Sequence, residues 1–503
     1  MTRYVWIFTN SYYNWLWKGL ARGLETSLGL KAVIFAGTEQ DKGFYEHQPP
    51  TDYACHVEVP CNPYNVVLAG RHPTRDEAEV VAYLRAFERE HDFSVAREML
   101  LPDRHVGRGY YFGATGSPRS KTSIATTLAG AQAACAVQIE YWREQFKSMP
   151  PALVISYAGG GGIRFKPVSV LCRHLGVPMR ILVSGRIRDL MYWADDEYHY
   201  SERLAKIFGR SFSVEEGIVA PKVVAPSLPN QLANNPKSQK RRRIADSLFR
   251  TTLLAGHVIA GRIYNRLRGY EKSRTGYFAL SMVAQLFRGW SQRRLLRRLT
   301  VPTLPEGRRI VYFPLHVEPE ASTLVLSPDN TNQLGIALDL ALALPADTVL
   351  VVKEHPFQIG RRATDLYRAL AEIPNVVFLE PEYPSIEVIS RADLVCTITG
   401  SVGYEAAAMG KQVVFFWHKT ILSGLPQVAL MPRGVEPERL VALLDRASTA
   451  DPVTGKIAGA VFLARAIANF NDFGHYDIHG RAAPPNDAEL AEIIAGLRVG
   501  LAQ

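Results

Sequence analysis

The sequence contains few cysteines and no long apolar run. Its 503 residues include five cysteines, which are scattered and form no Cys-x-x-Cys pair, so neither a disulfide framework nor a zinc site is expected. No stretch reaches the roughly 18 consecutive apolar residues that a membrane-spanning helix requires. The first apolar run stops at Thr9 and is shorter than the hydrophobic region of a signal peptide. These absences predict a cytoplasmic protein.

Several catalytic motifs are also missing. The sequence has no G-x-x-x-x-G-K-[ST], no H-E-x-x-H and no G-x-S-x-G. Their absence argues against P-loop hydrolases, zinc proteases and serine hydrolases. We expect neither a metal ion nor a bound cofactor.

Acidic residues are scarce in one segment of the chain. Between Lys237 and Arg298, about 16 Lys and Arg residues stand against Asp246 and Glu271, a local charge of about +14, while the whole chain carries +10. The rest of the chain is therefore mildly acidic, at about −4. This distribution argues against a nucleic-acid-binding protein, in which basic residues would spread over a folded face.

The basic segment has a helical pattern. Residues 219–239 are rich in Pro, Asn, Ser and Lys and predict a linker. Two basic amphipathic helices are expected after it, within 248–267 and 277–298. Their apolar faces either pack on the body of the protein or, together with the cations, bind an anionic membrane surface.

Strand-like and helix-like segments alternate in both halves of the chain, which predicts α/β domains with parallel sheets. We expect two doubly wound, Rossmann-like domains, at 1–218 and 301–503, with a linker and basic helical insert at 219–300. The last helices of the chain can pack back on the first domain. The expected strands are 4–8, 31–35, 152–156, 179–183, 310–313, 348–352, 376–378, 394–398 and 412–416. The expected helices are 15–28, 76–91, 124–145, 167–175, 333–344, 364–373, 385–391 and 403–409.

The strand at 348–352 in the second domain ends in polar residues. Lys353 and His355 follow the strand at 348–352, and Pro356 ends it. Ligands bind at the carboxyl ends of strands in open α/β sheets, so both side chains are candidate donor or catalytic groups. A histidine there can contact a phosphate oxygen or protonate a leaving group.

A glycine-rich turn follows the strand at 394–398. Thr399 and the run Gly400-Ser-Val-Gly403 lead into a helix, whose first amide groups suit a phosphate or diphosphate. The hydroxyls of Thr399 and Ser401 are additional candidate donors. Glu405 can accept hydrogen bonds from ribose hydroxyls. We therefore expect Thr399, Gly400, Ser401, Gly403 and Glu405 to bind a nucleotide.

Two acids and a histidine follow the strand at 310–313. His316, Glu318 and Glu320 crowd one strand end, where such groups cost solvation energy unless they are used. We expect Glu318 and Glu320 to be catalytic and His316 to line the cleft between the domains.

The first domain is less informative. Asn10 follows the first strand. After the strand at 152–156 comes a run of four glycines that includes Gly160, where a ligand can approach the backbone, and Arg164 follows this run. These three residues are candidate acceptor contacts. The acidic run Asp195-Asp-Glu197 is interpreted as a solvated turn.

Three motifs resemble the capsule polysaccharide biosynthesis family of bacterial glycosyltransferases. They are Phe-Pro-Leu-His-Val-Glu-Pro-Glu at 313–320, Lys-Glu-His-Pro at 353–356 and Thr-Gly-Ser-Val-Gly-Tyr-Glu-Ala-Ala-Ala-Met-Gly-Lys at 399–411. The resemblance covers about 309–424 and implies the two-Rossmann GT-B fold. The family includes transferases that use CMP-activated Kdo, and it shares a His-Pro and a Ser/Thr motif with bacterial sialyltransferases. By this resemblance His355 contacts the donor phosphate and assists its departure, while Ser401 and Thr399 bind the same phosphate.

The sequence departs from the family in two places. Such Kdo transferases carry an acidic pair before a glycine in the N-terminal half, whereas this chain has Gly159–Gly162 followed by Ile163-Arg164. Either the carboxylate comes from Glu318, Glu320 or Asp196, or the reaction differs, or the activity is lost. The basic segment 237–298 matches no part of the family pattern.

The resemblance implies a glycosyltransferase that moves a sugar from a nucleotide-sugar donor, such as CMP-Kdo or a similar acidic sugar, to a capsular or lipid-linked acceptor. It would act in the cytoplasm, at the inner face of the membrane if 237–298 binds anionic lipid, and would not bind nucleic acid. Two alternatives stay open. One is a sugar-nucleotide epimerase of the same fold, and the other is an inactive glycan-biosynthesis scaffold.

Overall fold

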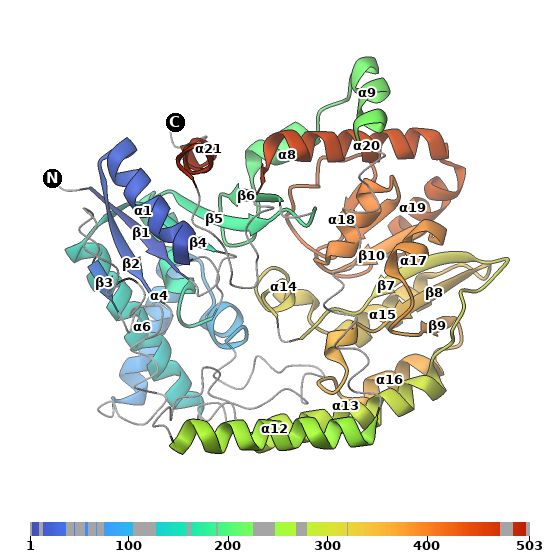
Figure 1. Ribbon diagram of the computed structural model, residues 1–503, viewed down its shortest axis with the longest axis horizontal. Coiled ribbons are helices and arrows are strands. Elements are labelled where there is room, and N and C mark those ends of the chain that lie inside the picture. Colours follow the sequence, from blue (N-terminus) through green and yellow to red (C-terminus); the bar gives the residue numbers. More distant parts are fainter. Residues whose placement is uncertain are drawn as a thin grey trace. The chain divides into compact units, whose positions relative to one another are not determined.

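The computed structural model describes residues 3–9, 14–36, 45, 56–58, 67, 75–103, 127–157, 162–187, 190–224, 247–267, 279–318, 320–472 and 486–498. The chain divides into two compact units, each built on one sheet (Figure 1). Unit 1 comprises residues 1–102, 126–208 and 465–503, and unit 2 comprises 103–125 and 209–464. The predicted class, α/β with two Rossmann-like domains, is confirmed.

Unit 1 has a seven-stranded sheet in the order β13-β6-β5-β4-β1-β2-β3. Its strands are β1 (Arg3–Phe8), β2 (Leu30–Phe35), β3 (His56–Glu58), β4 (Pro151–Tyr157), β5 (Met179–Ser184), β6 (Leu190–Ala194) and β13 (Asn471–Asp472). Strands β1 to β5 pair in parallel, but β6 is antiparallel to β5 and β13 is antiparallel to β6. The connection from β5 to β6 is too short for the crossover that a parallel pair requires. The expectation of a fully parallel sheet is therefore wrong at this edge.

The helices of unit 1 are α1 (Asn14–Leu28), α4 (Glu77–His91), α6 (Leu128–Ser148), α7 (Lys166–Leu175), α8 (Glu202–Phe208) and α21 (Asp487–Arg498), with a short π-helix at Ala96–Leu100. Helices α1 and α21 pack together against the sheet, and their apolar faces join the buried side chains of β1 and β4 in one core. Trp6, Phe35 and Trp142 form an aromatic cluster on α6 and the neighbouring strands. Burial of these large rings stabilises the packing of α6 on the sheet.

Unit 2 has a six-stranded sheet in the order β12-β11-β10-β7-β8-β9, with every adjacent pair parallel. The strands are β7 (Arg309–Pro314), β8 (Thr348–Lys353), β9 (Val376–Leu379), β10 (Leu394–Thr397), β11 (Gln412–Phe415) and β12 (Val428–Leu430). The chain runs outward from β7 to β9 on one side and then returns to build β10 to β12 on the other. The strand order therefore reverses between β7 and β10, where open α/β sheets usually bind their ligands.

The helices around this sheet are α14 (Ala321–Leu324), α15 (Gln333–Ala343), α16 (Thr364–Glu372), α17 (Ser385–Arg391), α18 (Ser401–Ala408), α19 (Pro437–Thr449) and α20 (Pro452–Asn469), with short 3-10 turns at Pro328–Asn330 and Pro356–Gln358. One buried core joins apolar side chains from a single face of the strands, such as Val311 and Leu350, to the inward faces of α15, α16 and α19. The boundary between the two units falls within α20.

The basic segment forms two helices, α12 (Leu248–Leu267) and α13 (Ala279–Leu299), which pack side by side along unit 2 (Figure 1). Leu296 of α13 belongs to the buried core of this unit, so α13 is an integral part of it. Helix α12 is different, because Phe249, Leu253 and Leu267 are 71%, 58% and 82% exposed. The apolar face of α12 therefore does not pack entirely on the body of the protein. In the described residues, no helix combines the length and apolarity needed to cross a bilayer.

The predicted linker at 219–239 is partly wrong. Helix α9 runs through Val214–Val224, while residues 225–246 lie outside the described part of the chain. Ser213 and Glu216 begin α9 with a capping box, in which each side chain accepts from the other's backbone N–H at 3.1 and 3.0 Å. Ala220 of α9 then packs on α20. This start signal was present in the sequence, three residues apart.

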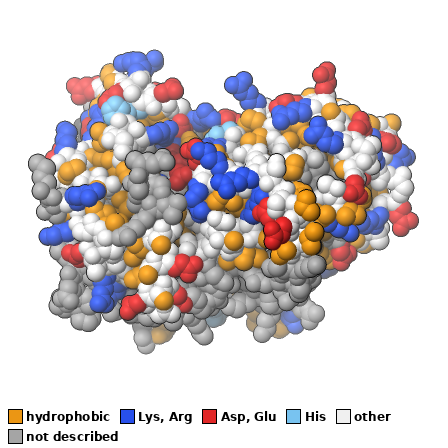
Figure 2. Space-filling view, turned by 90° about the horizontal axis from the view of Figure 1, so that it is seen from above, with side chains coloured by type: hydrophobic (Ala, Val, Ile, Leu, Met, Phe, Trp, Pro, Cys, Tyr) orange, Lys and Arg blue, Asp and Glu red, His pale blue; other side chains and the backbone are white. Residues whose placement is uncertain are grey.

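Acidic and basic side chains are interspersed on the face seen in Figure 2. Ion pairs of this kind link α8 internally, where Lys206 lies 2.7 Å from Glu202. Exposed pairs contribute little to stability.

Candidate functional site

The carboxyl ends of β7 and β10 meet through His316. The Nε2 atom of His316 accepts a hydrogen bond from the Thr399 backbone N–H at 3.2 Å and lies 3.3 Å from the Thr397 hydroxyl. The Thr397 hydroxyl in turn accepts from the Gly400 N–H at 3.2 Å. The side chains of His316, Thr397 and Thr399 are all buried. The structure thus brings His316 and the glycine-rich turn together where the strand order reverses.

Two glycines of that turn are required by packing. A Cβ atom at Gly400 would lie 2.8 Å from the Thr397 hydroxyl and 3.0 Å from His316 Nε2. A Cβ at Gly403 would lie 2.3 Å from the Phe415 ring, so Gly403 lets α18 pack closely on β11. Gly403 therefore faces the sheet and Phe415. The expectation that Gly403 contacts a nucleotide does not fit this position.

The first turn of α18 presents donors that the protein does not use. Helix α18 begins after Gly400 without a side-chain cap. In the described part of the chain, no acceptor contacts the backbone N–H of Ser401 or Val402, or the Ser401 hydroxyl. Unsatisfied amides at a helix N-terminus carry partial positive charge and suit an anion.

Thr399 has another partner. Its hydroxyl donates to the backbone carbonyl of Ser322 at 2.5 Å, and its side chain is fully buried. The single hydroxyl proton of Thr399 is therefore already directed to the protein. The expectation that Thr399 donates to a ligand phosphate does not fit this geometry, whereas the expectation for Ser401 does.

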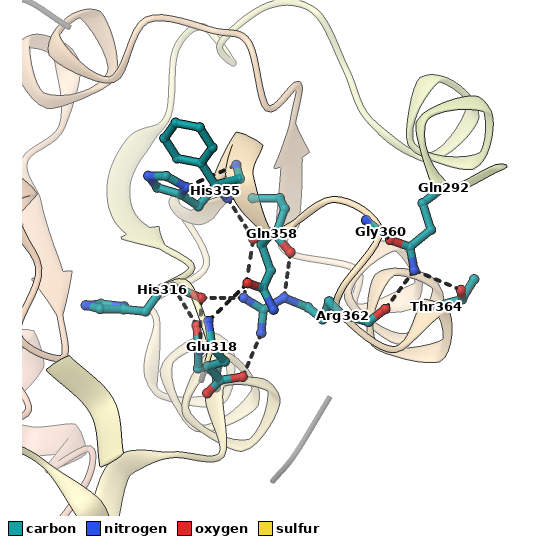
Figure 3. Close-up of polar contacts among 11 residues, drawn as sticks. Gln292, His316, Glu318, His355, Gln358, Gly360, Arg362 and Thr364 are labelled. Atoms are coloured by element: carbon teal, nitrogen blue, oxygen red, sulfur yellow. Dashed lines mark hydrogen bonds and ion pairs between the residues drawn. The ribbon is translucent and has the colours of Figure 1, made fainter. Parts of the chain in front are cut away.

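His355 caps the turn that follows β8. Its Nδ1 accepts from the Phe357 backbone N–H at 3.3 Å, and the two rings stack with centroids 5.4 Å apart. Because Nδ1 accepts this bond, the neutral imidazole carries its proton on Nε2. Figure 3 shows the imidazoles of His355 and His316 pointing to the same side, away from the Arg362 guanidinium. Lys353 is buried, and its Nζ contacts the carbonyl of Pro381 at 3.4 Å.

A cluster of buried charged side chains lies behind these strand ends (Figure 3). Its central member, Arg362, is not among the residues predicted from the sequence. The Arg362 guanidinium donates to Glu354 Oε2 at 2.5 Å, to Glu318 Oε2 at 3.1 Å and to the His316 carbonyl at 2.5 Å. Glu354 also accepts from the His355 N–H at 2.7 Å. Arg362 therefore fixes the backbone of both histidines at once. The side chains of Arg362, Glu354 and Glu318 are almost completely buried.

The two predicted catalytic acids differ in their surroundings. Glu318 is 3% exposed and paired with Arg362, and its backbone N–H donates to Gln358 at 3.0 Å. A carboxylate held in this way positions the loop and cannot reach a substrate, so the catalytic assignment of Glu318 is replaced by a structural one. Glu320 is exposed just before α14, and it accepts from the Ser322 hydroxyl at 3.3 Å. Because the Ser322 carbonyl contacts Thr399, Glu320 lies near the α18 turn.

The Glu318 carboxyl makes stability depend on pH. Burial raises its pKa to about 7, and the attraction of Arg362 offsets this only in part. Between about pH 4.5, the value of an unperturbed Glu, and pH 7, the folded state binds more protons than the unfolded state. The free energy of unfolding therefore falls as pH rises through this range.

Glu318→Gln should remove this slope, because an amide cannot ionise. As pH rises from about 5 to about 8, the wild type should lose stability and the variant should not, so the difference in the free energy of unfolding should shift in favour of the variant. Urea unfolding at both pH values measures this difference. Glu320→Gln, an exposed acid two residues away, is the matched control and should leave the slope unchanged. Equal slopes in all three proteins would contradict the raised pKa.

The remaining predicted residues are not brought into this cluster. Glu405 lies half-buried in the first turns of α18. In unit 1, the carbonyl of Arg164 accepts from the Trp142 indole at 2.9 Å. Asn10 and Gly160 lie outside the described residues. Asp196 accepts from the Tyr198 and Tyr200 amides at 3.0 and 3.2 Å and so closes a turn.

Glu197 corrects the interpretation of 195–197 as a solvated turn. Glu197 is 2% exposed and lies 2.9 Å from Lys166 and 3.2 Å from Arg173. Burial alone favours the neutral carboxyl, but Lys166 and Arg173 outweigh it and lower the pKa of Glu197. The acid thus anchors α7 to the end of β6.

One group of described side chains has metal-ligating types close together. The ligand atoms of Glu90, His91 and His174 lie within 4.8 Å of one another. However, Arg143 Nη2 lies 2.6 Å from Glu90 Oε2 and 3.5 Å from His91 Nε2. The guanidinium already supplies a positive charge to these atoms, so the group does not indicate a metal centre.

Residues 210–419 match the family model of capsule polysaccharide biosynthesis proteins. The match includes all three motifs that carry the sequence resemblance, which is thereby confirmed. It also includes the basic segment, contrary to the expectation that 237–298 lies outside the family pattern.

Solved structures with a similar trace include two KpsC transferases from Thermosulfurimonas dismutans. The chain is 16% identical to the beta Kdo 2,7 transferase, with a TM-score of 0.32 over 64% of this chain and 80% of that one. It is 15% identical to the beta Kdo 2,4 transferase, with a TM-score of 0.29 over 62% and 79%. The UDP-GlcNAc 2-epimerase of Neisseria meningitidis is 11% identical, with a TM-score of 0.25 over 93% and 100%. These values are too low to carry an argument about activity. Comparison with curated protein sequences finds no match.

Proposed function

We propose that this protein transfers a sugar from a nucleotide-sugar donor to a glycan or lipid-linked acceptor. The observation that carries the proposal is the first turn of α18, where the Ser401 and Val402 amides and the Ser401 hydroxyl lack a protein partner in the described chain. They lie at the strand-order reversal, beside His316. The family match supports the reaction class.

Each residue has a distinct task in this proposal. The α18 amides and Ser401 stabilise the negative charge that develops on the leaving phosphate. His355 donates a hydrogen bond from its Nε2–H to an oxygen of that phosphate and so stabilises the developing charge. His316 orients the turn by accepting from Thr399. Glu320, the exposed carboxylate near the turn, takes the proton from the acceptor hydroxyl.

The donor nucleotide is proposed to be CMP with an acidic sugar such as Kdo, in line with the family resemblance. A sugar-nucleotide epimerase would need the same phosphate contacts but no acceptor. Incubation with UDP-sugars alone separates the two, because only an epimerase yields an isomer. An inactive scaffold would tolerate His355→Ala without loss of glycan synthesis in cells.

Thermal shift with CMP, UDP, GDP and their sugars tests the nucleotide site. A ligand that binds only the folded state raises Tm, and we expect one nucleotide class to do so. Ser401→Ala removes the hydroxyl and should reduce the shift. Ser401→Pro also removes the amide and should abolish it, while proline at the first helical position after the extended Gly400 preserves the fold. Full shifts in both variants would refute the site.

The proposed membrane contact of 237–298 stays a prediction, together with a location at the inner face of the membrane. It is supported by the exposed apolar side chains of α12, including Phe249 and Leu253, and by the positive charge of the segment. Amphipathic helices bind anionic bilayers through both features.

A further inference from the structure

A cavity of about 370 Å³ lies between α13 and α16 in unit 2. Arginines from both helices line it: Arg294 and Arg298 on α13, and Arg368 on α16. Trp290 and Thr364 complete its wall. The cavity is separate from the α18 turn and uses none of the residues proposed to bind the nucleotide.

The positive charges of this cavity are poorly neutralised. In the described chain, no carboxylate lies within ion-pair distance of Arg294 or Arg298, and the Arg294 guanidinium lies 5.1 Å above the Trp290 ring. Arg368 has only the exposed Asp365, at 2.9 Å. Three guanidinium groups around one cavity repel one another. An anion in the cavity would relieve that repulsion.

Helix α16 adds to the positive potential. Thr364 is its first residue, and the preceding Ala363 provides no side-chain cap. The partial positive charge of the helix N-terminus therefore faces the same cavity as the arginines. Arginine binds phosphate oxygens with two parallel hydrogen bonds. We propose that this cavity binds a phosphate monoester or diphosphate group, from either an anionic lipid head group or a soluble phosphate ester.

The cavity is rigidly connected to the site at the strand ends. Gln292, which also lines it, donates to the Arg362 carbonyl at 2.7 Å and accepts from the Gly360 N–H at 2.7 Å. Gly360 has φ +92°, and a Cβ there would lie 2.9 Å from Gly289 Cα on α13. The close approach of these two glycines holds α13 against the loop. A ligand between α13 and α16 therefore lies one side chain away from the backbone of Arg362.

Calorimetric titration of the full chain with inorganic pyrophosphate tests the cavity. The Arg294→Ala/Arg298→Ala variant should lose about 10- to 100-fold in affinity, which corresponds to about 1.4–2.8 kcal/mol in total. Arg446→Ala/Lys456→Ala removes the same charge from exposed positions of α19 and α20 and should bind like the wild type. Unliganded Tm values identify any variant that fails to fold.

Ser401→Pro separates this inference from the proposed function. We expect it to lose nucleotide binding and to retain pyrophosphate binding in the cavity. If pyrophosphate binding is lost in Ser401→Pro and retained in Arg294→Ala/Arg298→Ala, the only anion site is the α18 turn and the inference fails. It also fails if both charge-removal variants weaken binding equally.

Sedimentation with phosphatidylcholine vesicles that contain phosphatidic acid distinguishes the sources of the phosphate. If Arg294→Ala/Arg298→Ala loses vesicle binding as well as pyrophosphate binding, the cavity takes a lipid head group. If it loses pyrophosphate binding alone, the cavity takes a soluble phosphate ester. Phe249→Ser/Leu253→Ser tests the α12 contact, because it should lose vesicle binding and keep pyrophosphate binding. Vesicle binding equal to the wild type would overturn that contact.

Discussion

Arg362→Met should lower the free energy of unfolding of unit 2 by about 3–5 kcal/mol. The substitution leaves Glu354 and Glu318 buried without the guanidinium that contacts both carboxylates. Methionine fills much of the space but offers no hydrogen-bond donor to either acid or to the His316 carbonyl. Urea denaturation, followed by tryptophan fluorescence, measures the change.

The matched control is Arg368→Met on the same segment. Arg368 pairs with Asp365 at 2.9 Å, but both side chains are exposed, so the expected loss is below about 1 kcal/mol. A similar small loss for Arg362→Met would show that the buried cluster does not stabilise the strand ends. Arg362→Met combined with Glu318→Gln should recover part of the stability, because one of the two stranded charges is removed.

His355→Ala should reduce the rate of sugar transfer by about 100-fold or more, the usual contribution of one hydrogen-bond donor to a developing negative charge. The variant loses the Nε2–H donor, while the α18 amides remain to bind the donor phosphate. The effect should therefore fall mainly on kcat, with a smaller change in KM. A radiolabelled or mass-spectrometric transfer assay with the nucleotide-sugar found by thermal shift measures both.

His355→Asn separates chemistry from structure. An asparagine side chain can still accept from the Phe357 N–H and so preserve the turn after β8, but it has no Nε2–H to donate to the phosphate. We expect His355→Asn to be as slow as His355→Ala. Recovery of the wild-type rate in the asparagine variant would reduce His355 to a capping residue.

The sheet of unit 2 could be predicted closely from the sequence. Its strands are short apolar runs between helical segments, and the strand predicted at 348–352 is Thr348–Lys353 in the structure. Chain direction in a parallel sheet then places His316 and the α18 turn on one edge, as the structure does. These predictions succeed because they depend on local pattern and on one topological rule.

The support of the site could not be predicted in the same way. Arg362 contacts residues eight and 44 positions away, and no spacing rule identifies an ion pair formed by a turn between a strand and a helix. The sequence equally gave no sign that Glu318 is buried while Glu320, two residues on, is exposed. Burial of a charge depends on its three-dimensional neighbours. The edge strand β6 reverses direction for a local reason, its short connection to β5.

The contact between Gly289 and Gly360 has a consequence for how the domain tolerates change. A single methyl group at position 360 would wedge α13 outward, since the nearest obstacles are backbone atoms that cannot rotate aside. Both bonds of Gln292 would break together, and the groove between the two helices would widen. Natural variants of this protein should therefore keep glycine at positions 289 and 360, even where the surrounding surface residues change.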